Sequence, residues 1–146
     1  MMHLPHLTDG QLAHIKAHAE CECPMECCGI LLADGTAMRC ENVAKDRTRF
    51  AEIGNFELQR IARHNTVIGF YHSHVDRPPL PSQEDFAGAN SFGMWYVIAS
   101  ARMCSGGRVT AIASYVLRGT MENKIFEHTV LRGGKTEVVQ IVKQRA

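Results

Sequence analysis

The sequence has no long apolar stretch and almost no net charge. No window approaches the roughly 18–20 apolar residues of a membrane helix, and the N-terminus lacks the basic and then apolar segments of an export signal. The 16 Lys and Arg residues nearly balance the 15 Asp and Glu residues, so no overall field would hold nucleic acid or an anionic membrane. We therefore expect a cytoplasmic protein that has neither nucleic acid nor a membrane as a partner.

Disulfides are not expected either, although the sequence contains 6 cysteines. The reducing cytosol keeps thiols reduced. Four of the cysteines, Cys21, Cys23, Cys27 and Cys28, follow the pattern C-x-C-x3-C-C, which is not a usual spacing for a structural zinc site. We predict free thiols, with one of Cys27 and Cys28 in the core and the other bordering a cleft. A structural metal is the lesser alternative.

The length and composition are those of one domain spanning residues 1–146, because 45% apolar and 21% charged residues is an ordinary balance. No internal repeat or linker divides the chain. Hydrophobic periodicity and turn residues predict a mixture of helices and strands. The helices are expected at residues 9–20, 55–64 and 82–90, and the strands at 28–33, 36–43, 66–72, 95–100, 108–117 and 124–128. Residues from 132 onward are predicted to form an edge element or to be partly free.

Local signals mark the ends of several elements. Thr8 or Asp9 is the expected N-cap of the first helix. The turn at residues 34–35, Asp-Gly, predicts a hairpin between the first two strands. Ser82 stands three residues before Asp85, an arrangement typical of a helix start.

The segment HSHVDRPPLPSQED concentrates side chains that bind metals. His72 and His74 are two residues apart on a predicted strand, so their imidazoles point to one face while Ser73 faces away. Ser82 and Asp85 are three residues apart on a predicted helix and share a face as well. Two short elements would thus bring two imidazoles and a carboxylate together.

Two neutral imidazoles and one carboxylate are ligands that zinc accepts, and they leave the fourth tetrahedral position open for water. This open arrangement is typical of catalytic zinc, which lowers the pKa of its water to about 7. We predict one Zn²⁺ per chain, bound by His72, His74 and Asp85.

A hydrolase of this kind also needs a base and a group that stabilises the oxyanion. Glu26 lies at the start of a predicted strand, in an otherwise apolar run, and is predicted to be the general base. Ser82 is predicted to donate a hydrogen bond to the tetrahedral oxyanion. A serine at a helix start is more often only an N-cap, and Ser82 could do both.

Together these residues resemble the JAMM or MPN-plus metalloproteases, whose signature is an upstream Glu followed by H-x-H-x7-S-x2-D. The sequence matches every position, and the context P-x-E-x-C-G-x-L around Glu26 looks like that of prokaryotic members. The resemblance implies an α+β, three-layer-like fold of the cytidine deaminase type, in which helices flank a curved, mostly antiparallel sheet with zinc at its edge. One departure is Val75, where bacterial relatives often have proline.

The resemblance also implies a substrate. Stand-alone members of this length resemble the Mec-type peptidases, which hydrolyse the amide after the Gly-Gly tail of a small ubiquitin-like, ThiS-like sulfur-carrier protein and release cysteine or a C-terminal peptide. One alternative is an isopeptidase of a bacterial ubiquitin-like conjugation or defence system. Another is a non-catalytic MPN scaffold. A homodimer is left open.

The remaining polar and aromatic residues have simpler interpretations. Six histidines lack a ligand pattern and are predicted to lie on the surface: His3, His6, His14, His18, His64 and His128. Trp95 and Tyr96 fit a buried strand. Residues 47–49, Arg102 and Arg108 could dock an acidic carrier, although single charges on loops are normally just solvated.

Overall fold

The computed structural model describes the backbone of residues 7–132 and 135–143, and side chains up to residue 127. The elements are α1 (Asp9–Glu22), β1 (Cys28–Leu32), β2 (Ala37–Cys40), α2 (Asn55–His64), β3 (Val67–Val75), α3 (Gln83–Gly88), β4 (Trp95–Arg102), the 3-10 turn η1 (Met103–Ser105), β5 (Arg108–Gly119), β6 (Lys124–Arg132) and β7 (Lys135–Lys143). Every predicted helix and strand is present. The tail forms an edge strand, which is one of the two alternatives left open for it.

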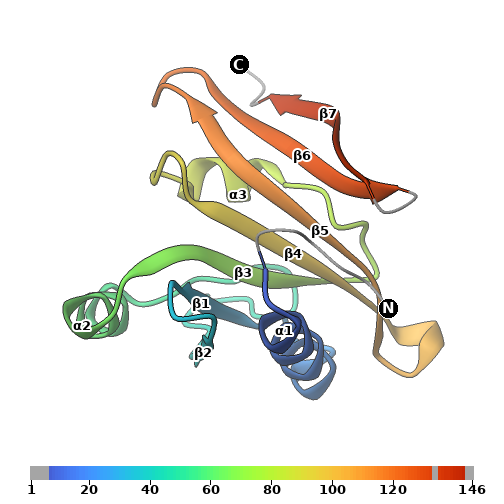
Figure 1. The fold of residues 1–146 in the computed structure, drawn as a ribbon. Helices are drawn as coiled ribbons and strands as arrows, with labels where there is room; N and C mark the ends of the chain where they lie inside the picture. Colours follow the sequence, from blue (N-terminus) through green and yellow to red (C-terminus); the bar gives the residue numbers. More distant parts are fainter. Residues whose placement is uncertain (1–6, 133–134, 144–146) are drawn as a thin grey trace.

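The strands form one seven-stranded sheet in the order β2-β1-β3-β4-β5-β6-β7 (Figure 1). Neighbouring strands are antiparallel except β3 and β4, which run parallel. The crossover between this parallel pair contains α3, as a parallel connection requires a long segment. The expected α+β fold with a mostly antiparallel sheet is therefore confirmed.

The helices cover opposite faces of the sheet. Buried residues of α1 pack with Tyr71 and Val97 on one face. On the other face, Ile61 of α2 joins the cluster around β1 and β2, and Phe86 of α3 packs with Ile98. The sheet thus has a hydrophobic core on each face. Side chains from the central strands are therefore buried on both faces.

The N-terminus of α1 is capped as the sequence predicts. The Thr8 hydroxyl accepts a 3.0 Å hydrogen bond from the Gln11 N–H, and the Gln11 amide oxygen accepts one of 3.0 Å from the Thr8 N–H. The Gln11 side chain also donates to the carbonyls of Leu32 and Thr36. One buried glutamine thus closes the cap and ties α1 to the β1–β2 hairpin.

His18 corrects a prediction, because it is buried, with 3% of its surface exposed. It lies on the inner side of α1, where its Nδ1 is 2.7 Å from the Tyr71 hydroxyl. The Nε2 of half-buried His14 lies 3.0 Å from the same hydroxyl. The Tyr71 ring passes so close to Gly29 that a Cβ there would stand 2.2 Å from it. The two histidines are therefore partners of a buried tyrosine.

The other histidine predictions have mixed outcomes. His64 is exposed at the end of α2, as expected. His3 and His6, and the side chain of His128, lie outside the described residues. Trp95 and Tyr96 are only partly buried on β4.

No helix among the described residues has both the length and the apolar character to span a bilayer. All 6 cysteines are free thiols. Cys27 and Cys28 are both buried and lie in clusters on opposite faces of the sheet.

Burial lowers the pKa of His18 from 6.5 to about 4, and the Arg39 charge acts in the same direction. In the unfolded chain the ring protonates near the ordinary value of 6.5, so the folded state loses stability as pH falls from 6.5 towards about 4. We expect this histidine to contribute a loss on the order of 2 kcal/mol. Urea unfolding of wild type and His18→Gln over this range should show a smaller loss in the variant. His64→Gln is the matched control and should follow wild type; equal slopes for all three proteins would contradict the assignment.

Candidate metal centre

Strand β3 carries His72 and His74 to the sheet face that α2 and α3 cover. The strand continues through Val75, beyond the predicted end at residue 72, because β1 and β4 both pair with it. Cys28 is the β1 partner of His72, and Ser100 is the β4 partner of His74. Pairing on both sides fixes the backbone beneath the two imidazoles.

Helix α3 brings in the third predicted ligand. Ser82 is its N-cap: the hydroxyl accepts from the Asp85 N–H at 3.2 Å, and Asp85 Oδ2 accepts from the Ser82 N–H at 2.8 Å. This reciprocal capping box orients the carboxylate. The Ser82 hydroxyl is the acceptor in its bond with the Asp85 N–H, so its own proton can be donated to another group.

The three predicted ligands converge. The Nε2 atoms of His72 and His74 are 3.2 Å apart, and Asp85 lies 3.1 Å from the first nitrogen and 3.3 Å from the second. Two atoms bound to one tetrahedral zinc ion are separated by about 3.3–3.4 Å, given bonds of about 2.0–2.1 Å. These three side chains are the group within the described residues that could hold a metal ion, and their spacing fits zinc.

A hydrogen bond fixes the orientation of the His74 ring. Its Nδ1 lies 2.9 Å from the Pro78 carbonyl, and a carbonyl can only accept, so Nδ1 carries the proton. The Nε2 atom then faces the other predicted ligands, which is the orientation that a metal-binding imidazole requires. The neighbouring carbonyls are held too, since Ser100 Oγ donates to Arg77 O at 2.5 Å and the Tyr115 hydroxyl donates to Pro79 O at 2.7 Å. Buried donors thus anchor the loop between the ligands.

The charges of the cluster are mutually dependent. Burial alone would raise the pKa of Asp85, but His72, His74 and the Ser82 N–H hold it well below its usual value. Burial lowers the pKa of His72, yet the neighbouring Asp85 carboxylate outweighs it and the net shift is upward. An anionic carboxylate facing two imidazoles is a strong attraction for a cation.

Glu26, the predicted base, lies two residues before β1 and reaches the same face. Cys27 and Ser73 are joined by two hydrogen bonds, Cys27 N–H to Ser73 Oγ at 2.8 Å and Ser73 N–H to Cys27 O at 3.0 Å. Because Cys28 is opposite His72, this register places Glu26 opposite His74. Opposed residues of an antiparallel pair project to one face. Glu26 is therefore on the metal-ligand face, and it is 2% exposed.

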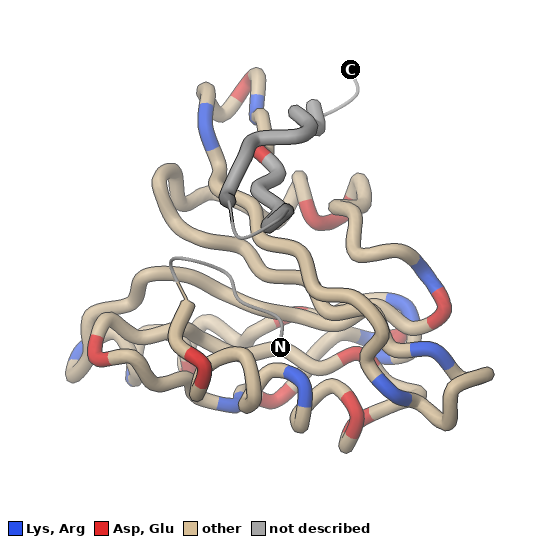
Figure 2. Tube along the Cα trace, turned by 45° about the vertical axis from the view of Figure 1, so that its right-hand side comes forward, with Lys and Arg blue, Asp and Glu red and all other residues tan. Residues whose placement is uncertain are grey.

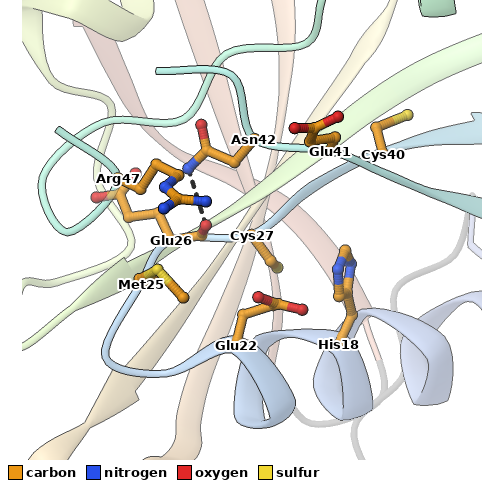
Figure 3. A pocket seen from close by; sticks show the side chains of 9 residues that line it. All are labelled: His18, Glu22, Met25, Glu26, Cys27, Cys40, Glu41, Asn42 and Arg47. Atoms are coloured by element: carbon orange, nitrogen blue, oxygen red, sulfur yellow. Dashed lines mark hydrogen bonds between the residues drawn. The ribbon is translucent and has the colours of Figure 1, made fainter. Parts of the chain in front are cut away.

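The backbone of Glu26 is held on both sides. Its N–H donates to the Arg47 carbonyl at 2.7 Å, and its carbonyl accepts from the Asn42 side chain at 2.9 Å, the dashed line in Figure 3. The pocket in this view is lined by Cys27 and by His18 of α1, but by none of the three metal ligands. The expected division between Cys27 and Cys28 is thus partly correct: both are buried, and Cys27 borders this pocket, which Glu26 also lines.

Arg77 is a residue of the site that the sequence analysis missed. Its Nη2 forms an ion pair with Glu26 Oε2 and donates to the Arg49 carbonyl at 3.1 Å. Burial raises the pKa of Glu26, and His72, His74 and Arg77 oppose this without cancelling it. A carboxyl with a raised pKa suits proton transfer near neutral pH. In the sequence, the one indication that Arg77 belongs to the site is its position three residues after His74. This indication is weak, because an arginine on a loop is usually solvated.

Elsewhere, basic and acidic residues are intermingled along the described trace (Figure 2). The docking role of residues 47–49, Arg102 and Arg108 stays a prediction.

Lys124 is a second residue that sequence reasoning did not find. It is 3% exposed, and its ammonium donates to the carbonyls of Phe86 and Ala89 at the C-terminal end of α3. A helix of 6 residues is too short to be stable alone. The capping box at one end and this cation at the other, where the helix dipole favours positive charge, therefore hold Asp85 in place.

Comparison with known proteins identifies the family. Residues 9–115 match the family described as prokaryotic homologues of the JAB domain. The chain belongs to this family. The matched part of the JAB domain contains all five residues of the predicted site, and the resemblance noted in the sequence is confirmed.

Two curated relatives were found. A protein of Haloferax volcanii named desampylase is 32% identical over 114 residues, which cover 70% of this JAB domain chain and 79% of the relative. The tail tip assembly protein K of Escherichia phage N15 is 28% identical over 89 residues, covering 58% of this chain and 37% of that protein.

Two solved structures have the same fold. A solution structure from Desulfitobacterium hafniense has a TM-score of 0.60 at 24% identity and covers 77% of this chain and 83% of its own. One from Salinibacter ruber has a TM-score of 0.53 at 28% identity and covers 77% of this chain and 81% of its own.

Reconstituted wild-type protein should bind one zinc ion per chain, as measured by elemental analysis after gel filtration. His72→Ala and Asp85→Ala each remove one of three ligands and should lose most of the metal, whereas the control His64→Ala should keep it. Unchanged zinc content in His72→Ala would show that the metal lies elsewhere.

Lys124→Met should lower the free energy of unfolding by about 1–3 kcal/mol, because it removes the ammonium that donates to the buried Ala89 carbonyl and leaves the Phe86 carbonyl with the Ala89 N–H as its donor. It should also weaken zinc binding, since the loosened helix carries Asp85. Lys45→Met changes an exposed lysine and is the control for both measurements. A variant as stable as wild type, with unchanged zinc affinity, would remove Lys124 from this role.

Proposed function

We propose that the protein is a zinc-dependent metallopeptidase that hydrolyses the amide bond after the Gly-Gly tail of a small ubiquitin-like sulfur-carrier protein. The observation that carries this is the convergence of His72, His74 and Asp85 within hydrogen-bond distance, with buried Glu26 on the same sheet face. Three ligands of this kind leave a position for water, as catalytic zinc requires. The location we propose for this chemistry is the cytoplasm.

The residues divide the work of amide hydrolysis among them. His72, His74 and Asp85 would hold a zinc ion, which when bound would lower the pKa of a water molecule to about 7 and supply positive charge for the reaction. Glu26 accepts a proton from the attacking water, whose oxygen bonds to the carbonyl carbon. When the C–N bond breaks, its electron pair stays on nitrogen, and Glu26 returns the proton to that nitrogen. Ser82 donates its hydroxyl proton to the developing oxyanion.

The substrate class rests on relatives. Family membership and the Haloferax volcanii relative named desampylase support a peptidase of ubiquitin-like modifiers. Within this class of substrates we propose a sulfur-carrier protein, because the sequence resembles the stand-alone Mec-type peptidases.

A second candidate is an isopeptidase that removes a ubiquitin-like protein from a lysine side chain, which the desampylase relative favours. The two differ in whether the scissile amine belongs to an α-amino group or to a lysine. A non-catalytic scaffold is disfavoured by the complete set of ligands together with a buried acid.

Glu26→Gln should keep its zinc but hydrolyse at least about 10²-fold more slowly, because a carboxamide cannot carry the proton. The substrates for the test are the ubiquitin-like proteins of the source genome, extended past Gly-Gly by one or two residues, with products weighed by mass spectrometry. Glu22→Gln, a change at a nearby acid on α1, is the control and should hydrolyse at the wild-type rate. Near-normal turnover by Glu26→Gln would exclude Glu26 as the base, and the absence of any cleavage by zinc-loaded wild type would reject the proposed substrate class.

A further inference from the structure

The guanidinium of Arg77 occupies a distinctive position beside the predicted base. It forms an ion pair with Glu26, yet 41% of the Arg77 side chain is exposed whereas the Glu26 side chain is 2% exposed. The arginine therefore bridges a buried acid and the solvent side of the site. A group arriving from solvent meets Arg77 before it meets Glu26.

The loop that carries Arg77 is anchored by its backbone. The carbonyls of Arg77, Pro78 and Pro79 accept hydrogen bonds from Ser100, His74 and Tyr115 respectively. Because these donors come from β3, β4 and β5, the start of the arginine side chain is fixed relative to the metal ligands. The guanidinium is thus presented to the site by a rigid support.

The arginine also keeps donors for another ligand. Both of its hydrogen bonds to described residues, to Glu26 Oε2 and to the Arg49 carbonyl, use Nη2. A guanidinium has five N–H donors in a planar fork that matches a carboxylate. Nη1 makes no hydrogen bond to a described residue, so an arriving carboxylate can accept from Nη1 and, by displacing Glu26, from Nη2 as well.

The chemistry of the reaction identifies which carboxylate could arrive there. Glu26 delivers a proton to the leaving nitrogen, so that nitrogen comes within hydrogen-bond reach of the Glu26 carboxylate. If the leaving group is a C-terminal amino acid, its α-carboxylate is attached to the carbon next to that nitrogen. A guanidinium in contact with Glu26 is then close to this carboxylate. A lysine side chain would instead place uncharged methylene groups beside Arg77.

We propose that Arg77 binds the free α-carboxylate of the residue that is released, so that the protein removes a single C-terminal amino acid in preference to cleaving a lysine isopeptide. This inference rests on the proposed function. In the free protein Glu26 takes the place of the substrate carboxylate. Substrate binding draws Arg77 to its own carboxylate and leaves Glu26 free to accept the proton of water.

Two forms of one substrate test the proposal. The substrate is a ubiquitin-like protein extended past Gly-Gly by one alanine and made either with a free carboxylate or as the carboxamide. We expect kcat/KM of wild type to be at least 10-fold higher for the acid. Arg77→Gln should lose this preference by slowing only with the acid, and Arg77→Lys should keep part of it. Arg63→Gln, which changes an exposed arginine of α2, is the control and should behave as wild type. An equal loss on both forms would assign Arg77 a structural or general catalytic role and overturn the inference.

A binding measurement separates this inference from the proposed function. Acetylated Gly-Gly-Ala, as acid and as amide, is titrated into zinc-loaded protein and followed by NMR, which requires no turnover. The acid should bind at least 10-fold more tightly than the amide, and Glu26→Gln should strengthen acid binding because it removes the competing carboxylate. Arg77→Gln should abolish the difference. Selective binding without hydrolysis would reject the reaction but keep the carboxylate site, whereas equal or undetectable binding of the two forms would reject the site.

Discussion

The pairing of β1 with β3 is the constraint on which the rest of the site depends. Ser73 holds Cys27 through two hydrogen bonds, and this register sets Glu26 opposite His74. A shift of one residue would send Glu26 to the α1 face and bring Cys27 to the ligand face, since strand side chains alternate. Because of the same alternation, the side chains of Tyr71 and Ser73 lie on the sheet face covered by α1, and those of His72 and His74 lie on the face covered by α3. The register of this strand pair, more than any one contact, brings the predicted metal ligands and the acid to one face.

Much of the fold and the site could be predicted because the signals are local. A few adjacent residues are enough to predict the Thr8 cap, the hairpin turn and the start of α3 at Ser82. The structure has each of these features. The spacing of His72 and His74 translates directly into a shared strand face. These features need no knowledge of how distant segments pack.

The remaining features arise from contacts between distant segments. Arg77 meets Glu26 across 51 positions, and Lys124 meets Ala89 across 35, so no local pattern connects either pair. His18 looked like a surface residue because a polar side chain on an amphipathic helix is usually solvated; its partner, Tyr71, comes from another strand. The parallel pairing of β3 with β4 likewise depends on the whole sheet order.

The lysine beneath α3 has a consequence for the order in which the molecule is assembled during synthesis. His72, His74 and Asp85 leave the ribosome before Lys124, the cation that holds the end of the ligand helix. A nascent chain that stops short of β6 contains every predicted metal ligand but lacks the support for the third one. We therefore expect the candidate metal site to be completed only after β6 has been made, because the helix that carries Asp85 gains its support from that strand.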